Sequence, residues 1–226
     1  MEEQFGQIAG LIGDPVRAKI LWALLDKRAY TATELAVYAN TTAPNISMHL
    51  NKLVKADLLT VQSQGRHKYY NYSRPEIAYA IEALASLLPK QDQKRPDAAD
   101  EKPVRFCRSC YDHLAGKVGV TLTEGLLKQQ YIIKDGAGFA VTVEGETWFD
   151  TLGINLSELK KQKRHFAKPC LDWSERKHHL AGALGAALLT RMIADGWVRR
   201  VVDSRAITVT RKGEEAFVEH FKTDIR

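Results

Sequence analysis

The sequence contains no long hydrophobic run and few cysteines. No apolar stretch approaches the roughly 18 to 20 residues that a membrane helix needs, and the acidic, mixed start MEEQFGQIAG is unlike a signal peptide. Only three cysteines are present, an odd number that argues against a disulfide scaffold. These absences predict a cytoplasmic protein that makes no contact with a membrane and keeps its thiols reduced.

The sequence motifs of common enzyme classes are also missing. There is no G-x-S-x-G, no Walker loop, no H-E-x-x-H and no G-x-G-x-x-G after an expected strand. We therefore expect no enzymatic activity. What remains is ordinary globular composition, with 45% hydrophobic and 27% charged residues and a net charge of +6 that permits nucleic-acid binding.

The positive charge of the N-terminal half is concentrated in one segment. Residues 41–74 carry five basic side chains against Asp57 alone, whereas residues 1–40 are nearly balanced. Further along, PKQDQKRPDAADEKP has three prolines, many charges and almost no large apolar residue, so it is predicted to be a linker over 89–103. The expected domains are therefore 1–88 and 104–226.

The first domain has the pattern of a winged helix-turn-helix. Helices are predicted over 15–27, 31–40 and 42–56, and a final helix over 75–88 carries a broad apolar stripe that suggests a partner helix. Between the last two, two β-prone runs flank a polar loop at 62–65, which indicates a hairpin, the wing. Overall, the expected fold class is α+β, mostly α.

Helix 42–56 and the wing form the predicted DNA-binding site. Polar residues fall between the apolar positions of this helix, so they should face outward into a major groove, while the basic wing reaches the neighbouring backbone or minor groove. The helix N-terminus, with its unpaired amides, suits a phosphate. The predicted DNA contacts are Thr42, Asn45, Ser47, His49, Lys52, Lys55, Arg66, His67 and Lys68.

These features resemble the ArsR/SmtB family of bacterial regulators over about the first 88 residues. The resemblance lies in the order R-x-x-I-L, E-L-A, I-S-x-H-L-x-x-L and G-R-x-x-Y-Y. It implies a homodimer, joined by the first and last helices of this domain, that represses transcription by binding an inverted repeat in a double-stranded DNA operator. The C-terminal half is similar to the extension of a longer subgroup of these regulators.

The metal sites common in that family are not carried over. Many relatives hold a cysteine pair in the E-L-C-x-C segment, where this chain has Ala36 and Tyr38. A second familial site uses Asp, His and Glu on the dimer helix, and 75–88 contains no histidine. Any effector site is therefore expected elsewhere in the chain.

The C-terminal half contains an internal repeat. The tetrapeptide His-Leu-Ala-Gly at 113–116 recurs at 179–182, and the similarity continues through Gly119 with Gly185 and Tyr131 with Trp197. We expect two helix-hairpin-helix units, over about 106–153 and 169–226, packed into one domain or forming two small lobes.

The three cysteines lie near this repeat, and Cys110 and Cys170 sit at related points in its two copies, which favours their lying close together in space. Cys107-x-x-Cys110 with His113, together with Cys170, could bind a metal ion or form a thiol switch. A tetrahedral site would have to recruit a further histidine, from His113, His178 or His179. The same cysteines could instead be small buried hydrophobic residues. No cofactor is certain, and oxidation, a metal or a small molecule remain open as the effector that releases DNA.

Two functions of other classes remain as alternatives. A thiol-disulfide oxidoreductase would use Cys107 and Cys110, but it would need that motif at a helix start within a βαβ pattern. A protein-docking module would use the basic run KKQKRHFAK at 160–168, although a solvated charge run is commoner.

Overall fold

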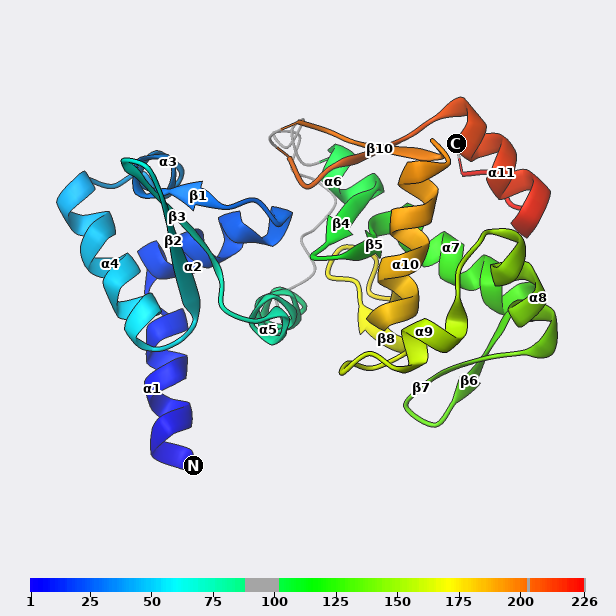
Figure 1. Cartoon of the computed structure of the whole chain (residues 1–226), viewed down its shortest axis with the longest axis horizontal. Coiled ribbons are helices and arrows are strands. Elements are labelled where there is room, and N and C mark those ends of the chain that lie inside the picture. The colour runs from blue at the N-terminus through cyan, green and yellow to red at the C-terminus, as the bar shows by residue number, and fades with distance from the viewer. Residues whose placement is uncertain (88–101, 203, 226) are drawn as a thin grey trace. The chain divides into compact units, whose positions relative to one another are not determined.

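The computed structural model describes residues 1–87, 102–202 and 204–225, which fall into two compact units, Met1–Leu84 and Ala85–Arg226 (Figure 1). The predicted linker at 89–103 lies almost wholly outside the described residues, so the domain boundaries at 88 and 104 stay a prediction. No helix in the described ranges combines the length and apolar character needed to cross a membrane.

The N-terminal unit is built mainly from helices. Asp14 caps one of them by accepting from the amides of Val16 and Arg17, both at 3.0 Å, and Thr31 forms the expected capping box with Glu34. The first helix, which buries no side chain within its unit, was not predicted. The helices are α1 (Glu2–Ile12), α2 (Pro15–Ala23) with a 3-10 turn (Leu24–Asp26), α3 (Ala32–Ala39), α4 (Ala43–Lys55) and α5 (Pro75–Ala85).

The wing is a three-stranded antiparallel sheet in the order β1-β3-β2, formed by β1 (Tyr30–Thr31), β2 (Leu59–Gln64) and β3 (His67–Tyr72). Gln64 pairs with His67, so the turn consists of Gly65 and Arg66 rather than the predicted loop at 62–65. Gly65 has a φ of 60°, which suits glycine in a two-residue hairpin turn. Residues 62–64 continue the strand because backbone pairing in this exposed ribbon does not need apolar side chains.

The C-terminal unit repeats one order of elements. Each copy consists of a hairpin, a helix, a second hairpin and a second helix, and the hairpin that opens each copy was not predicted. The two segments are joined by α9 (Leu156–Lys160) and preceded by α6 (Lys102–Phe106). The first segment comprises β4 (Arg108–Cys110), β5 (His113–Ala115), α7 (Gly116–Lys128), β6 (Ile132–Asp135), β7 (Gly138–Val141) and α8 (Val143–Thr151). The second comprises β8 (Lys168–Leu171), β9 (His178–Ala181), α10 (Gly182–Ala194), β10 (Val198–Arg200), β11 (Ile207–Val209) and α11 (Arg211–Phe221).

The two segments share one hydrophobic core. Leu122 and Phe149 of the first segment and Leu188 and Phe217 of the second are all nearly fully buried in the same cluster. Each central helix also lies on a hairpin of the other segment. A Cβ added at Gly119 of α7 would lie 3.8 Å from the His179 Cβ, and one added at Gly185 of α10 would lie 3.2 Å from the His113 Cβ. The C-terminal unit is therefore one packed body rather than two small lobes.

Close backbone approach makes two equivalent glycines essential to this packing. A Cβ on Gly145 would lie 1.9 Å from the carbonyl oxygen of Tyr131, and one on Gly213 would lie 2.1 Å from that of Trp197. We expect Gly145→Ala and Gly213→Ala each to destabilise the C-terminal unit by about 1–3 kcal/mol, since main chain must move.

Urea unfolding followed by tryptophan fluorescence measures this effect, because three of the four tryptophans lie in that unit. Gly10→Ala is the control, since nothing lies within 4 Å of an added Cβ in helix α1. Unchanged unfolding midpoints in both core variants would show that the tight approach is not a packing constraint.

Candidate DNA-reading surface and cysteine-histidine cluster

Helix α4 presents one face to the core and the other to solvent. Ile46, Leu50 and Leu53 are at most 1% exposed and fix the helix against its unit. The residues at the complementary helical positions are all exposed: Pro44, Ser47, Met48, Asn51, Lys52 and Lys55. A polar, basic face of this kind is the part of a helix-turn-helix that enters a major groove.

The N-terminal end of α4 has its own polar groups. Thr42 is the exposed N-cap residue, and its side chain makes no capping hydrogen bond. Asn45 is half-buried, and its side-chain amide donates to Thr41 Oγ1 at 2.7 Å. Asn45 is therefore held in place by its own chain, whereas Thr42 leaves its hydroxyl beside the free amides of the helix start.

The outward-facing role predicted for His49 is wrong. His49 is only 6% exposed, and its Nδ1 lies 3.4 Å both from Asp14 Oδ1 and from Arg17 Nη1. Arg17 is itself buried and donates from Nε to the Leu11 carbonyl at 2.6 Å. Position 49 belongs to the buried series 46, 49, 50 and 53, so His49 ties α4 to the start of α2.

Electrostatics around Asp14 support this structural role. The hydrogen bond from the backbone amide of Arg17 is the main cause that lowers the pKa of Asp14 below its ordinary value. Burial acts in the opposite direction, and the positive charge of the Arg17 side chain lowers the pKa further. The carboxylate therefore stays ionised at the junction where α2 and α4 meet.

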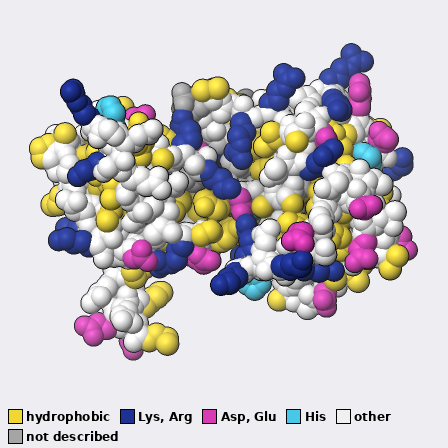
Figure 2. All heavy atoms as spheres, viewed as in Figure 1, with side chains coloured by type: hydrophobic (Ala, Val, Ile, Leu, Met, Phe, Trp, Pro, Cys, Tyr) yellow, Lys and Arg dark blue, Asp and Glu magenta, His cyan; other side chains and the backbone are white. Residues whose placement is uncertain are grey.

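The wing carries exposed positive charge. Arg66 lies in the turn, with His67 and Lys68 beginning the returning strand, and all three are exposed. Figure 2 shows Lys and Arg side chains, in dark blue, over α4 and beside the hairpin tip. The predicted basic segment also includes Arg74, but this side chain forms an ion pair with Asp57. The charge available to DNA thus belongs to α4 and the wing tip.

Asn51 was missed by the sequence reasoning. It is exposed on α4, four residues after Ser47 and so on the same face. The helical spacing that placed Ser47 and Lys52 outward was enough to include it.

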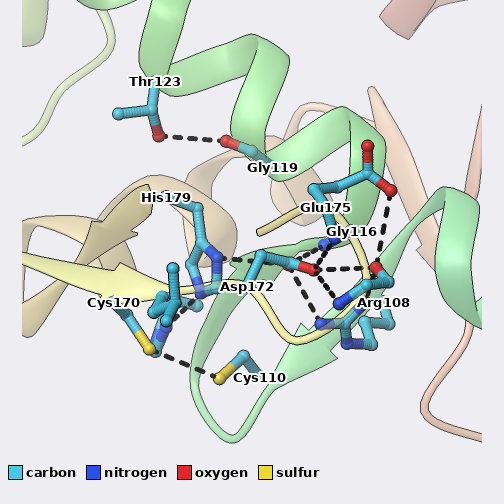
Figure 3. Close-up of polar contacts among 12 residues, drawn as sticks. Arg108, Cys110, Gly116, Gly119, Thr123, Cys170, Asp172, Glu175 and His179 are labelled. Atoms are coloured by element: carbon cyan, nitrogen blue, oxygen red, sulfur yellow. Dashed lines mark hydrogen bonds and ion pairs between the residues drawn. The ribbon is translucent and has the colours of Figure 1, made fainter. Parts of the chain in front are cut away.

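In the C-terminal unit, four side chains from two hairpins converge. Across β4–β5, Cys110 is the register partner of His113, and across β8–β9, Cys170 is the register partner of His179. The two Sγ atoms lie 3.9 Å apart and the two Nε2 atoms 3.0 Å apart. One donor atom from each residue lies within 4.8 Å of the others, and Figure 3 shows the two cysteines side by side. We call these four residues the CH cluster.

Each histidine of the CH cluster has a carboxylate beside its other ring nitrogen. His113 Nδ1 lies 3.1 Å from Asp112 Oδ1, and His179 Nδ1 lies 3.2 Å from Asp172 Oδ2. Both histidines have an exposed fraction of 0%. The carboxylates therefore orient both rings so that the Nε2 atoms face each other.

Arginines in turn hold the carboxylates. Arg108 donates to Asp172 Oδ2 at 2.9 Å, with both side chains fully buried, and Arg164 donates to Asp112 Oδ2 at 2.6 Å (Figure 3 shows the first pair). Burial alone would raise the pKa of Asp172, but its contacts with His179 and the Arg108 charge hold it well below the ordinary value. Both carboxylates are accordingly ionised.

The cysteines differ sharply in environment. Hydrogen bonding to the Cys110 thiol is the largest influence on the pKa of Cys170 and lowers it, and contacts with the two histidines lower it further. Together these contacts outweigh burial, which alone would raise the pKa. Cys107 is 0% exposed within the hydrophobic core, and burial raises its pKa to about 12. The predicted grouping of Cys107 with Cys110 and Cys170 is therefore wrong: Cys107 is a small buried hydrophobic residue, and His179 takes its place in the cluster.

A repeated Cys-x-Asp motif underlies this arrangement. Cys110 and Asp112 correspond to Cys170 and Asp172, 60 residues on, whereas the histidines are 66 apart. The second hairpin has a longer loop, which accounts for the different offset. The sequence indicated related positions for Cys110 and Cys170, but it did not indicate that Asp112 and Asp172 belong to the same motif.

The structure weighs against both alternative functions. Cys107 and Cys110 flank the start of a β-hairpin rather than of a helix, so they do not form an oxidoreductase motif. In the basic run at 160–168, Arg164 pairs with Asp112 and Lys161 with Glu158 at 2.7 Å. Part of the positive charge of this run is therefore neutralised by ion pairs inside the C-terminal unit, which leaves less of it to bind a partner.

The fold of residues 1–84 and the exposed α4 face define a winged helix-turn-helix DNA-binding protein. A helix-turn-helix domain model matches residues 12–62. The HTH-type transcriptional regulator YdfF of Bacillus subtilis is 43% identical over 226 residues, the whole of both chains.

Shorter relatives match part of the chain. The transcriptional repressor SdpR of B. subtilis is 33% identical over 81 residues, 36% of this chain and 89% of that one. The solved structure of the cadmium metal-sensor CmtR of Mycobacterium tuberculosis is 28% identical, with a TM-score of 0.33, and covers 42% of this chain and 98% of that one. The chain belongs to the family of helix-turn-helix transcriptional regulators that includes YdfF. Its relatives are DNA-binding regulators rather than enzymes, as the sequence predicted.

His49 is buried and Lys52 is exposed on the same helix, so substitutions at these two positions can distinguish a structural role from a role in DNA contact. We expect His49→Ala to lower the free energy of unfolding of the N-terminal unit by about 1–3 kcal/mol, because the buried Arg17 and Asp14 lose a polar neighbour. Lys52→Ala, on the exposed face of the same helix, should change it by less than about 0.5 kcal/mol. Chemical denaturation followed by circular dichroism measures both, and equal effects would contradict the assignment.

Proposed function

We propose that the protein is a homodimeric repressor that binds an inverted repeat in double-stranded DNA and releases it when an effector acts on the C-terminal unit. The observation that carries the DNA-binding part is the exposed face of α4 beside the basic wing tip. Binding to chromosomal operators places the protein in the cytoplasm.

Each element of the reading surface has a distinct task. Helix α4 enters the major groove, where Ser47 and Asn51 reach base edges and Lys52 and Lys55 contact phosphates. Thr42 and the free amides at the helix start bind a phosphate, and Asn45 holds that end in shape. Arg66, His67 and Lys68 bind the neighbouring backbone or minor groove, which adds affinity more than sequence discrimination.

Unburied apolar surface supports a dimer. Helix α1 buries no side chain and leaves Phe5 74% exposed, and Leu84 on α5 is 44% exposed. Surfaces of this kind are commonly covered by another chain. A twofold pair would present two α4 helices to successive major grooves, so the operator is an inverted repeat.

The CH cluster is the proposed effector site. Its two thiols lie close enough to react with an oxidant or to bind a metal, and their unit contains no part of the reading surface. Effector binding that favours one conformation needs only about 1.4 kcal/mol of coupling to change operator affinity tenfold.

Selection from a random pool of DNA duplexes tests the proposed operator. We expect an enriched inverted repeat with half-sites about one helical turn apart and a complex of two chains per duplex. No enrichment, or enrichment of single half-sites bound by one chain, would contradict the dimeric repressor.

Substitutions on α4 test which residues bind DNA. Replacing both Lys52 and Lys55 by alanine should weaken binding to all sequences and reduce the slope of log affinity against log salt by roughly 2, because two phosphate contacts are lost. Asn51→Ala should instead relax selectivity at one base position. Fluorescence anisotropy on the selected duplex measures these effects, with the double variant Arg211→Ala and Lys212→Ala in α11 as a charge-matched control. Equal losses in the control would show that net charge alone drives binding.

The effector role predicts a change in operator affinity that depends on the cluster. Treating the wild-type protein with diamide or with zinc chloride should reduce affinity at least tenfold in one of the two arms, and Cys170→Ser should abolish that response. Cys107→Ala is the matched control and should keep it. Affinity that is the same in every arm would remove the cluster from regulation, while leaving the DNA-binding proposal intact.

A further inference from the structure

The donor atoms of the CH cluster have the spacing of a tetrahedral metal site. Bond lengths of about 2.3 Å for Zn–S and 2.0–2.1 Å for Zn–N place two sulfurs about 3.8 Å apart and two nitrogens about 3.3 Å apart in a tetrahedron. The observed separations are 3.9 Å between the sulfurs and 3.0 Å between the Nε2 atoms. These two separations fit a tetrahedral site, and all four donors lie within 4.8 Å of one another, so side-chain adjustments can bring them around one ion.

The charge of the cluster also suits a divalent ion. Binding M²⁺ to two thiols and two neutral imidazoles releases two protons and leaves two thiolates, so ion and ligands sum to zero. A neutral site can be buried at low cost, as the burial of Cys110, His113 and His179 requires. The outer carboxylates are balanced separately by Arg108 and Arg164.

Carboxylates beside the Nδ1 atoms of both histidines suit the two rings to bind a metal ion. Metal-binding histidines usually give their second ring N–H to a carboxylate, which fixes the tautomer and ring orientation. Asp112 and Asp172 lie beside the Nδ1 atoms of His113 and His179, and the Nε2 atoms of both rings face into the cluster. Two neutral imidazoles in this tautomer would place two lone pairs 3.0 Å apart, and a cation between them removes that repulsion.

We propose that Cys110, His113, Cys170 and His179 bind one zinc-class ion in a closed tetrahedral site that joins hairpin β4–β5 to hairpin β8–β9. Two thiolates and two imidazoles select zinc or a similar thiophilic ion over magnesium or calcium, which prefer oxygen ligands. Four protein ligands leave no position for a reacting water, so the ion binds without catalysing a reaction. This inference does not depend on operator binding.

Metal analysis of the full-length protein, purified without chelator, tests the site directly. We expect about one zinc per chain, lost with a strong chelator, and a chelator-induced fall of roughly 5 °C or more in the unfolding midpoint of the C-terminal unit. Cobalt added to the apo-protein should give the intense visible bands of tetrahedral coordination with thiolate charge transfer.

Variants separate ligands from neighbours. Cys110→Ser and His179→Asn should each lower bound zinc at least tenfold, whereas Cys107→Ala and His178→Asn should leave it at one per chain. Cys107 and His178 are matched controls because they are the remaining cysteine and the exposed neighbour of a ligand. The wild-type chelator and cobalt measurements remain decisive if a ligand variant does not fold.

Three results would overturn the proposal. Protein that neither contains zinc nor binds cobalt after reduction has no such site. Zinc that persists in the ligand variants is bound elsewhere. A mass two hydrogens below that of the reduced chain, with one free thiol in freshly isolated protein, would show that Cys110 and Cys170 form a disulfide instead. Each result can be obtained whether or not the protein binds an operator.

Discussion

Ion pairing in a water-free interior is the constraint on which the C-terminal unit depends. A buried carboxylate without a counter-charge costs several kcal/mol, so Asp172 and Arg108, both fully buried, are stable only together. That pair and its counterpart, Asp112 with Arg164, fix the two histidines at the centre of the unit. Because the pairs link residues 64 and 52 positions apart in the sequence, they also fix how the two halves of this unit meet.

The same principle positions the reading helix in the N-terminal unit. Arg17 is buried among the Leu11 carbonyl, His49 and Asp14, and these contacts set α4 against the start of α2. Because Ile46, Leu50 and Leu53 lie in the core, the opposite face of α4 is exposed to solvent. A rigid, exposed polar face can meet a groove without first being ordered, which reduces the entropy cost of binding.

Local sequence patterns predicted most of the N-terminal unit. Asp14 before Pro15 and the Thr31–Glu34 capping box mark helix starts through contacts between near neighbours, and both were found as expected. The prediction failed where local chemistry does not decide the outcome. The position of the turn at Gly65 and Arg66 depends on the register of the two strands. His49 is a polar residue, but it is buried where it contacts Arg17, which lies 32 positions away in the sequence. In the second half, the repeat indicated equivalent histidines and related positions for Cys110 and Cys170, but not that Asp112 and Asp172 would lie beside the histidine rings.

The sequence alone determined the class of the protein, because helix caps, apolar periodicity and the order of helix, turn, helix and wing are encoded between residues close in the chain. It also limited the possible ligands of a cysteine site to three cysteines and a few histidines. Only the tertiary structure decided which of them meet: Cys107 enters the apolar core, while His179 joins Cys110, His113 and Cys170. The physical reason is that the meeting of two hairpins depends on how α7 and α10 pack across the shared core, which no local pattern specifies.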